Sequence, residues 1–233
     1  MSTEKTIAIA GENSLIVYFA ENPSAAISIE IATTVKKLKT YLGTTLIDLV
    51  PSYASLLVIF DPFKTNHQSV RRAIHTAIKD LNKIANAPEI SSGSLVTLPV
   101  YYSSESGPDL QSVANTAGLS IAEVIAIHQQ TEYRVYAIGF APGFAYLGEV
   151  DLRIATPRLA TPRQQVPRGA VAIADQQTAV YPAQSPGGWN LIGLCPQLMF
   201  NPKISPSMPI AVGDLVRFEA IDKTTFENLG GVL

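Results

Sequence analysis

The sequence contains a single cysteine, Cys195, among 233 residues, so no disulfide can form within the chain. Charged residues make up only 15% of the sequence, and 17 basic against 19 acidic residues give a net charge of -2. This balance creates no overall positive field that would attract nucleic acid or an anionic membrane. We find no run of roughly 18 apolar residues and no basic segment leading into an apolar one after Met1. We therefore expect no membrane helix and no secretion signal, and a cytoplasmic location.

Missing motifs narrow the chemistry further. The chain has no Gly-Lys pair, so the phosphate-binding loop of the common nucleotide hydrolases is absent, and no Gly-x-Ser-x-Gly elbow occurs. Only three histidines accompany the one cysteine, which disfavours a metal site built from nitrogen and sulfur ligands, and we predict none. Chemistry at this protein must therefore use carboxylates, arginines, hydroxyls, amides and at most one or two histidines.

The first part of the chain alternates between strand-like and helix-like patterns. Short apolar runs flanked by turn residues predict strands, and apolar residues at helical spacing predict helices. The predicted elements are strands over 6–10 and 15–19, a helix over 27–42, strands over 45–50 and 55–60, and a helix over 70–81. Gly43 is a plausible C-terminal cap for the first helix. This order predicts a small split α/β sandwich.

The pattern changes at residues 85–93, which are rich in asparagine, proline, serine and glycine, and we place a domain boundary there. The predicted domains are 1–92 and 93–233. The second begins with a strand and two short helices, the latter opened by a capping box of Ser120 and Glu123. Ten of the sixteen prolines follow from Pro142 onward, and no amphipathic helical stripe appears there. Short strands forming a barrel or sandwich are therefore expected.

Arginine recurs every five residues over 153–168, in three of four cases directly after a proline. Each proline fixes its own φ and forces the preceding residue into an extended conformation, so this ribbon cannot be a helix. No lysine occurs over 84–202. Arginine without lysine suits two-pronged recognition of carboxylate or phosphate. We expect Arg158 or Arg163 to meet an anion; the alternative is that the arginines cover the surface or pair with nearby Glu149 and Asp151.

Two further clusters combine glycine with aromatic residues. Residues 139–148 contain three glycines and three aromatic residues, and residues 181–189 place the only tryptophan, Trp189, beside a Gly-Gly pair. Glycine permits tight turns and close approach of the backbone, while aromatic rings form walls. The clusters therefore predict the rim of a ligand site, with packing inside a barrel as the alternative.

His128 lies on the apolar stripe of the helix that the capping box opens, so we expect it to be at least partly buried. A buried histidine with one carbonyl partner is the common outcome. Glu132 follows closely in the sequence. A histidine oriented by a carboxylate is therefore the second interpretation.

Taken together and in order, these motifs resemble a known family. The matching segments are 133–148, the Thr-Pro-Arg repeat, 166–169, 177–178, 181–182 and 185–193. They resemble the B subunit of the bacterial biotin-independent 5-oxoprolinase, a family that includes Kip-type sporulation kinase inhibitors and is also called allophanate hydrolase subunit 1. The resemblance covers nearly the whole chain. It implies an α+β protein with an N-terminal ferredoxin-like α/β domain followed by a C-terminal cyclophilin-like β-barrel.

The resemblance also implies a function. Members open the lactam 5-oxo-L-proline to L-glutamate with ATP, and with Mg²⁺ alongside it. The B and C subunits together would activate the lactam carbonyl, and the A subunit would complete hydrolysis, so we expect this chain to be inactive alone. The alternative is a Kip-type inhibitor that binds a sensor histidine kinase through the barrel. Urea-amide hydrolysis ranks below both, because the serine-rich loop of amidases is missing.

Eight residues are functional candidates on this resemblance. Arg158 or Arg163 would hold a carboxylate or phosphate, and His128 would act as an acid or base. The candidate catalytic residues are His128, Glu132, Gln177 and Thr178. The candidate substrate-binding and anion-binding residues are Phe140, Arg158, Arg163 and Trp189.

Overall fold

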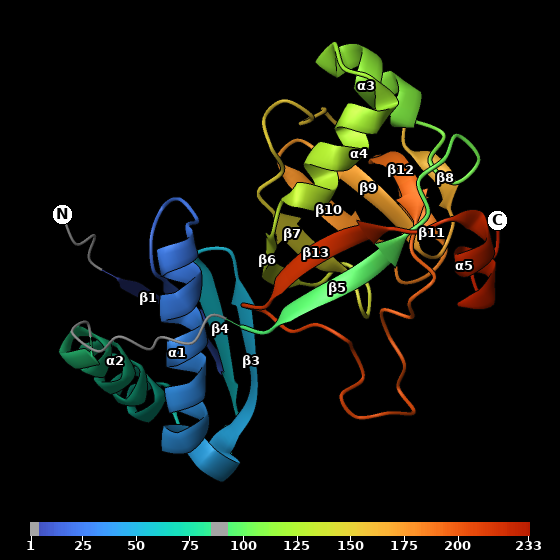
Figure 1. Ribbon diagram of the computed structural model, residues 1–233. Helices are drawn as coiled ribbons and strands as arrows, with labels where there is room; N and C mark the ends of the chain where they lie inside the picture. Colours follow the sequence, from blue (N-terminus) through green and yellow to red (C-terminus); the bar gives the residue numbers. More distant parts are fainter. Residues whose placement is uncertain (1–4, 85–92) are drawn as a thin grey trace. The chain divides into compact units, whose positions relative to one another are not determined.

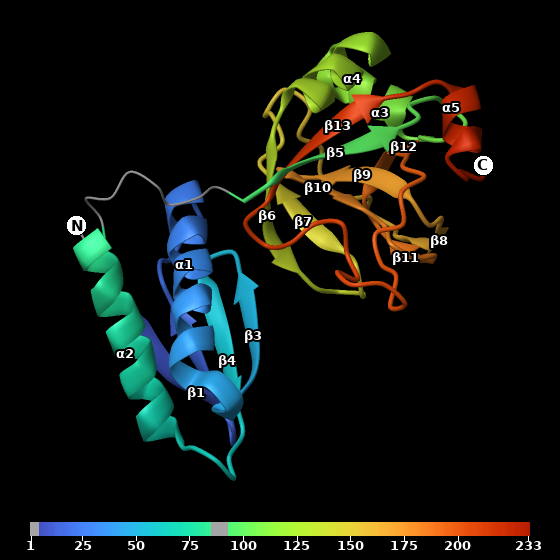
Figure 2. The ribbon, with the colours of Figure 1, turned by 60° about the horizontal axis from the view of Figure 1, so that its bottom comes forward.

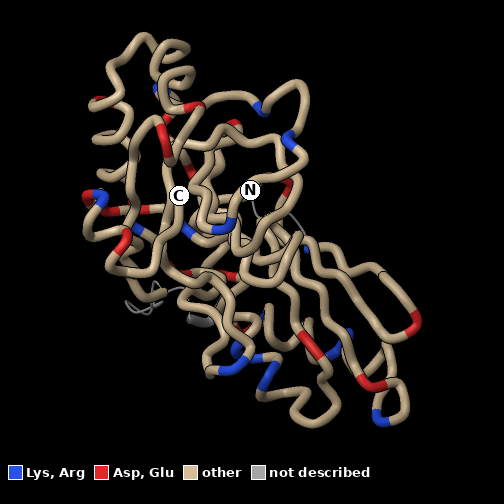
Figure 3. Tube along the Cα trace, turned by 90° about the vertical axis from the view of Figure 1, so that its right-hand side faces the viewer, with Lys and Arg blue, Asp and Glu red and all other residues tan. Residues whose placement is uncertain are grey.

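The computed structural model describes residues 5–84 and 93–233. The chain divides into two compact units, residues 1–92 and 93–233, which Figures 1 and 2 show from two directions. The segment 85–92, where the sequence predicts the boundary, lies outside the described residues. Basic and acidic residues are interspersed along the trace (Figure 3).

Within the described part of the chain, no single helix has the length and apolar character needed to cross a membrane. One pair of helices, Leu110–Ala117 and Ile121–Gln130, meets that test only when the two are added together, and they are bent by 92° relative to each other.

The N-terminal unit consists of four strands and two long helices. Its elements are β1 (Thr6–Gly11), β2 (Ser14–Tyr18), α1 (Ala25–Leu42), β3 (Leu46–Ser52), β4 (Ser55–Phe60) and α2 (His67–Ile84), with a short 3-10 turn at Gly43–Thr45. All six predicted elements are confirmed, with ends that differ by a few residues. Ser24 begins α1 by accepting a hydrogen bond from the Ile27 amide at 3.2 Å, and Gly43 ends it with a φ of 48°.

The core of this unit lies between the helices and one face of the sheet. Ile31 and Leu38 of α1 and Ile74 of α2 pack against sheet residues such as Val17 and Val58, and all five side chains are buried. These are the positions that the helical and alternating spacing of the sequence selects, because one face of each element must leave water.

The ferredoxin-like prediction for this unit is not confirmed. That fold runs β-α-β-β-α-β, whereas here each helix follows a hairpin, giving β-β-α-β-β-α. The strand order is β1-β2-β4-β3, and all neighbouring strands are antiparallel. Strands β2 and β3 are therefore parallel, joined through α1, with β4 between them. A split β-α-β unit of this kind also occurs in the ferredoxin-like fold. In this chain, one additional strand, β1, precedes the unit.

The C-terminal unit contains most of the strands. Its elements are β5 (Leu95–Val100), α3 (Leu110–Ala117), α4 (Ile121–Gln130), β6 (Tyr133–Ile138), β7 (Ala145–Gly148), β8 (Arg163–Val166), β9 (Ala170–Ala174), β10 (Gln177–Val180), β11 (Ser185–Gly187), β12 (Asn190–Leu194), β13 (Leu215–Ala220) and α5 (Lys223–Asn228). Seven strands form one sheet in the order β12-β9-β10-β7-β6-β13-β5, and β8 pairs separately with β11.

The two edges of the seven-stranded sheet meet. Tyr101, directly after β5, and Leu194 of β12 exchange backbone hydrogen bonds of 2.8 and 3.0 Å. Because β5 and β12 are the outermost strands, this bridge nearly closes the sheet into a barrel. The predicted barrel is confirmed, while its assignment to the cyclophilin-like kind stays a prediction.

Helix α4 begins at the predicted capping box. The Glu123 amide donates to Ser120 Oγ at 3.3 Å, and the Ser120 amide donates to Glu123 Oε2 at 2.8 Å. The helix places His128 in the barrel core, where it is fully buried.

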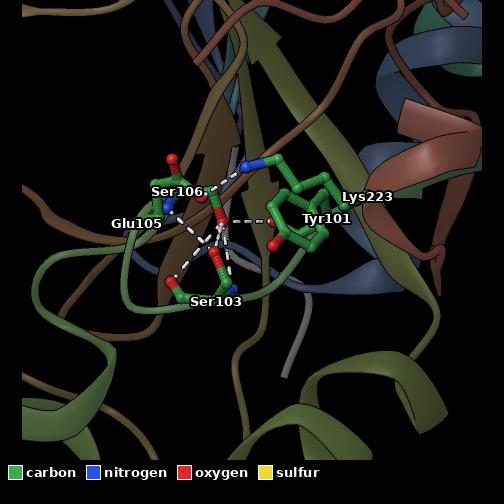
Figure 4. Close-up of polar contacts among 5 residues, drawn as sticks. All are labelled: Tyr101, Ser103, Glu105, Ser106 and Lys223. Atoms are coloured by element: carbon green, nitrogen blue, oxygen red, sulfur yellow. Dashed lines mark hydrogen bonds and ion pairs between the residues drawn. The ribbon is translucent and has the colours of Figure 1, made fainter. Parts of the chain in front are cut away.

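The chain between β5 and α3 is tied to the C-terminal helix α5. Ser103 and Ser106 close a tight turn by donating their amides to each other's Oγ atoms, each at 3.0 Å, and Ser106 Oγ also donates to the Tyr101 carbonyl at 2.7 Å. Figure 4 shows this turn beside the ion pair between Glu105 and Lys223, 2.9 Å long, which joins it to α5. The turn leads to Asp109, which occupies the N-cap position of α3 without a capping hydrogen bond from its side chain.

The predicted ribbon over 153–168 contains no helix, as the prolines require. Asn190 Nδ2 donates to the Pro157 carbonyl at 2.8 Å, and the Leu159 amide donates to the Gly188 carbonyl at 2.7 Å. The ribbon then enters β8. These bonds hold it beside the glycine-rich segment that precedes β12.

Candidate binding pocket in the C-terminal unit

A pocket of about 200 Å³ opens in the C-terminal unit. Three segments that are far apart in the sequence form its walls: the loop that leads into β7, the arginine ribbon, and the chain from Tyr181 to Trp189. Both glycine and aromatic clusters identified in the sequence therefore contribute to one pocket. Five aromatic side chains and one guanidinium group line it: Phe140, Phe144, Tyr146, Tyr181, Trp189 and Arg158.

Phe144 is the centre of the aromatic wall. Its ring meets the rings of Phe140, Tyr146, Tyr181 and Trp189 edge to face, with centroid distances of 5.2, 4.9, 5.3 and 5.7 Å. Such pairs contribute roughly 0.5–1.5 kcal/mol each beyond the burial of their area. Since Phe144 is itself buried, the rings hold one another in a preformed apolar cup.

Phe140 stands at the mouth of this cup. It is 65% exposed, and its φ of 71° lies in the left-handed region that bulky residues seldom adopt. Two backbone bonds close the loop around it: the Gly139 amide donates to the Phe144 carbonyl at 3.0 Å, and the Phe144 amide donates to the Ala141 carbonyl at 2.9 Å. Strained backbone of this kind is concentrated at ligand sites.

The Gly-Gly pair forms the floor near Tyr181. A Cβ atom on Gly187 would lie 2.4 Å from the Tyr181 hydroxyl, whereas one on Gly188 would meet its nearest neighbour at 3.6 Å. The position of Gly187 therefore requires glycine because the tyrosine approaches so closely.

Arg158 is the arginine that the pocket presents. Its guanidinium carbon lies 5.7 Å from the centre of the Trp189 ring, a cation–π contact, and the residue is exposed. Among the described residues, no carboxylate pairs with Arg158. Its five N–H donors are available to an anion that enters the cup.

Arg163, the second candidate, is engaged internally. Its Nη2 donates to Asp109 Oδ1 at 2.6 Å, and its Nη1 donates to the Trp189 carbonyl at 3.4 Å. Asp109 Oδ2 in turn accepts from the Leu191 amide at 2.7 Å. Arg153 pairs with Asp151 at 2.7 Å, which the sequence allowed as the alternative for the arginines.

His128 lies in the barrel core, outside the pocket lining. Its Nδ1 is 2.7 Å from the Tyr102 hydroxyl and its Nε2 is 3.1 Å from Thr178 Oγ1, while its ring stacks on Phe218 with centroids 4.6 Å apart. Burial lowers the pKa of His128 to about 3, so the imidazole is neutral at pH 7. The candidates His128 and Thr178 are thus brought together, as partners in a buried polar chain.

Glu132 and Gln177 take up other positions. Glu132 forms an ion pair with Arg217 of β13 instead of approaching a ring nitrogen of His128. The interpretation of His128 as a histidine oriented by Glu132 is therefore wrong; its burial is confirmed. Gln177 begins β10 opposite Gly148 of β7 and is half-buried.

Four residues of the pocket and its surroundings were not singled out from the sequence. Phe144, Tyr146 and Tyr181 lie inside the two glycine and aromatic clusters, so the clusters were the signal that could have found them. The pairing of Asp109 with Arg163 gave no signal in the sequence, because the two residues lie 54 positions apart. In the described part of the chain, no three His, Cys, Asp or Glu side chains gather as a metal site would require.

Comparisons with known proteins identify relatives of this chain. Residues 5–210 match the family described as carboxyltransferase domain, subdomain C and D. The chain is 34% identical over 236 residues to the 5-oxoprolinase B subunit of Bacillus subtilis (strain 168), and the match covers 97% of both proteins.

Solved structures agree with this relationship. The crystal structure of TTHA0988 has a TM-score of 0.78 and 33% identity, covering 90% of this chain and 40% of that one, so this chain spans less than half of that relative. The K. lactis urea amidolyase, at 16% identity and a TM-score of 0.72 over 97% of this chain and 15% of its own, shares the fold.

Proposed function

This chain belongs to the carboxyltransferase subdomain C and D family that includes the 5-oxoprolinase B subunit, and from that premise we propose that it is the B subunit of an ATP-dependent 5-oxoprolinase. The enzyme would convert 5-oxo-L-proline to L-glutamate together with the A and C subunits. The observation that carries this proposal is the aromatic pocket with one available guanidinium group, Arg158.

The chemistry of 5-oxo-L-proline suits such a pocket. The molecule is a small, flat five-membered lactam that bears one carboxylate. The planar fork of Arg158 can grip both carboxylate oxygens, and the rings of Phe144 and Trp189 offer apolar faces to the lactam ring. A pocket of about 200 Å³ has room for a ligand of this size.

Opening the lactam requires breaking a stable amide bond. Water adds to the carbonyl carbon, the C–N bond breaks, and the nitrogen leaves as the amine of L-glutamate. ATP supplies activation of the lactam oxygen, which makes the carbonyl carbon a better electrophile. The part of this chain would be to fix the substrate through its carboxylate and ring, so that the carbonyl is presented in one orientation.

The pocket itself does not fit ATP. A nucleoside triphosphate needs more volume than about 200 Å³ and more cationic groups than the single unpaired arginine that the described residues place there. We therefore propose that a partner protein of the complex holds the nucleotide and its Mg²⁺. His128 and Thr178 are buried and do not line the pocket, so we propose that they support the barrel from within and do not contact the substrate.

Relatives differ in how much protein accompanies this region. This chain covers 97% of the Bacillus subtilis protein but only 40% of the TTHA0988 chain. The same fold therefore occurs both as a separate polypeptide and within a longer one. This supports a role that depends on additional protein, which we propose to be the C and A subunits.

The test uses Trp189, the only tryptophan of the chain, as a reporter inside the pocket. Its fluorescence is followed while 5-oxo-L-proline is added to the chain, alone and mixed with a C-subunit homologue. We expect a saturable change, and none with 2-pyrrolidinone, which keeps the lactam ring and lacks the carboxylate. Equal responses to the two compounds, or none to either in the mixture, would contradict the proposal and favour the kinase-binding alternative.

A further inference from the structure

The ion pair between Asp109 and Arg163 adjoins two residues that line the pocket, Pro162 and Trp189. Asp109 is the N-cap residue of α3 and is buried, and its two oxygens are both used, one by Arg163 and one by the Leu191 amide. Arg163 also donates to the carbonyl of Trp189, which lines the pocket, and follows Pro162, which lines it as well. The pair therefore connects two pocket walls.

Arg163 lies close enough to act on the pocket electrostatically. Burial raises the pKa of the Tyr181 hydroxyl, and the positive charges of both Arg158 and Arg163 lower it. Tyr181 lines the pocket, so two guanidinium groups flank one of its walls. Of these two, Arg163 is compensated by Asp109, and Arg158 has no carboxylate partner among the described residues.

We propose that Asp109 is a specificity-determining residue. By pairing with Arg163, it leaves Arg158 as the single uncompensated cation at the pocket, so that the pocket selects small anions that carry one negative charge. Two uncompensated guanidinium groups would instead favour a dicarboxylate or a phosphate, because each added charge pair strengthens the attraction. This inference rests on the proposed role of the pocket as a ligand site.

The selection has a consequence for the reaction. The substrate carries one carboxylate, and ring opening creates a second one together with an amine that is protonated at neutral pH. With Arg163 held by Asp109, the described residues offer the new carboxylate no second uncompensated cation at the pocket. Product is therefore held no more tightly than substrate, which favours its release.

A purely structural role for the pair is the competing explanation. In that case the pair only fastens the ribbon to α3, and removing either partner weakens the fold without changing which anions bind. A double variant distinguishes an effect of charge from an effect of structure. Asp109→Asn removes one negative charge and Arg163→Gln removes one positive charge. The two substitutions together therefore keep the original net charge while the ion pair is still missing.

The experiment measures affinities of the full chain for 5-oxo-L-proline, with one negative charge, and glutarate, with two, through Trp189 fluorescence. We expect Asp109→Asn to raise the affinity for glutarate relative to 5-oxo-L-proline by at least about threefold at low salt. Arg163→Gln should shift this ratio the other way, and the double variant should return it to the wild-type value. The inference would be overturned if the affinity ratio in Asp109→Asn equals that of the wild type. It would also be overturned if the ratio in the double variant does not return toward the wild-type value.

Two controls complete the design. Asp151→Asn removes a carboxylate from an exposed ion pair on the same ribbon, with Arg153, and should leave the ratio unchanged. Quenching of Trp189 by iodide and by caesium reports the local charge without any ligand. Failure of the wild type to bind 5-oxo-L-proline would refute the proposed function. The role of Asp109 in setting the local charge would still stand if the iodide-to-caesium quenching ratio rises in Asp109→Asn and returns to the wild-type value in the double variant. An unchanged quenching ratio refutes that role regardless of substrate.

Discussion

The guanidinium group of Arg158 lies over the ring of Trp189, 5.7 Å from its centre. This contact joins the arginine ribbon to the glycine-rich segment before β12. The contact places the Arg158 guanidinium group beside the aromatic rings that line the pocket. A ligand could therefore pair its carboxylate with Arg158 while its apolar part packs against these rings.

Arg158→Lys should reduce the turnover of the three-subunit mixture by at least about tenfold, which corresponds to about 1.4 kcal/mol. Lysine keeps the charge, but it loses the two-pronged grip and most of the contact with Trp189. Glutamate release is measured per folded complex. Arg153→Lys is the matched control, since Arg153 lies on the same ribbon and pairs with Asp151, and its turnover should equal that of the wild type.

The purified chain alone should release no glutamate from 5-oxo-L-proline in the presence of ATP and Mg²⁺. The reason is the proposed division of roles, in which the pocket of this chain binds the substrate and a partner protein holds the nucleotide. A stable complex with a C-subunit homologue should appear as one peak in size-exclusion chromatography at micromolar concentration. Turnover by the single chain at the rate of the full mixture would refute this division of labour.

Gly187→Ala should destabilise the C-terminal unit by about 1–3 kcal/mol, the usual cost of an atom forced into a packed site. The new methyl group would collide with the buried Tyr181 hydroxyl, 2.4 Å away. The neighbouring substitution Gly188→Ala is the control, because its Cβ would meet nothing closer than 3.6 Å. Denaturant unfolding followed by Trp189 fluorescence compares the two; equal stabilities would show that Tyr181 can move away.

The buried His128 should make the C-terminal unit less stable in mild acid. Its pKa is lowered from 6.5 to about 3, so below pH 6.5 the unfolded chain binds a proton that the folded chain does not. The contribution of His128 to the free energy of unfolding is therefore fully present above about pH 6.5, and it is lost as the pH falls toward 3. Between pH 7 and pH 5 the loss should be about 2 kcal/mol.

His128→Gln isolates this effect, because glutamine does not titrate. Unfolding by denaturant, followed by Trp189 fluorescence at pH 7 and pH 5, should show a smaller loss in the variant than in the wild type. His75→Gln replaces an exposed histidine of α2 and should behave as the wild type does. An unchanged pH dependence in His128→Gln would mean that the histidine becomes protonated without unfolding.

Much of the fold follows from short-range signals in the sequence. The capping box of Ser120 and Glu123, the glycine cap at Gly43 and the proline-enforced ribbon are each decided by residues a few positions apart, and each occurs as predicted. The order of the strands within a sheet is not local. The sequence predicts the order of the elements along the N-terminal unit correctly, whereas the ferredoxin-like assignment, which came from the family resemblance, is not confirmed.

For the pocket, too, some features follow from the sequence and others depend on the tertiary structure. The sequence by itself identified the arginine ribbon and both aromatic clusters, because their residues are contiguous. It could not distinguish Arg158 from Arg163, since both follow a Thr-Pro pair. Only the folded C-terminal unit brings Asp109 within 2.6 Å of Arg163 across 54 residues, and Thr178 to His128 across 50. Which arginine stays free for a ligand is therefore decided by tertiary structure, because an ion pair depends on distance in space and not on distance along the chain.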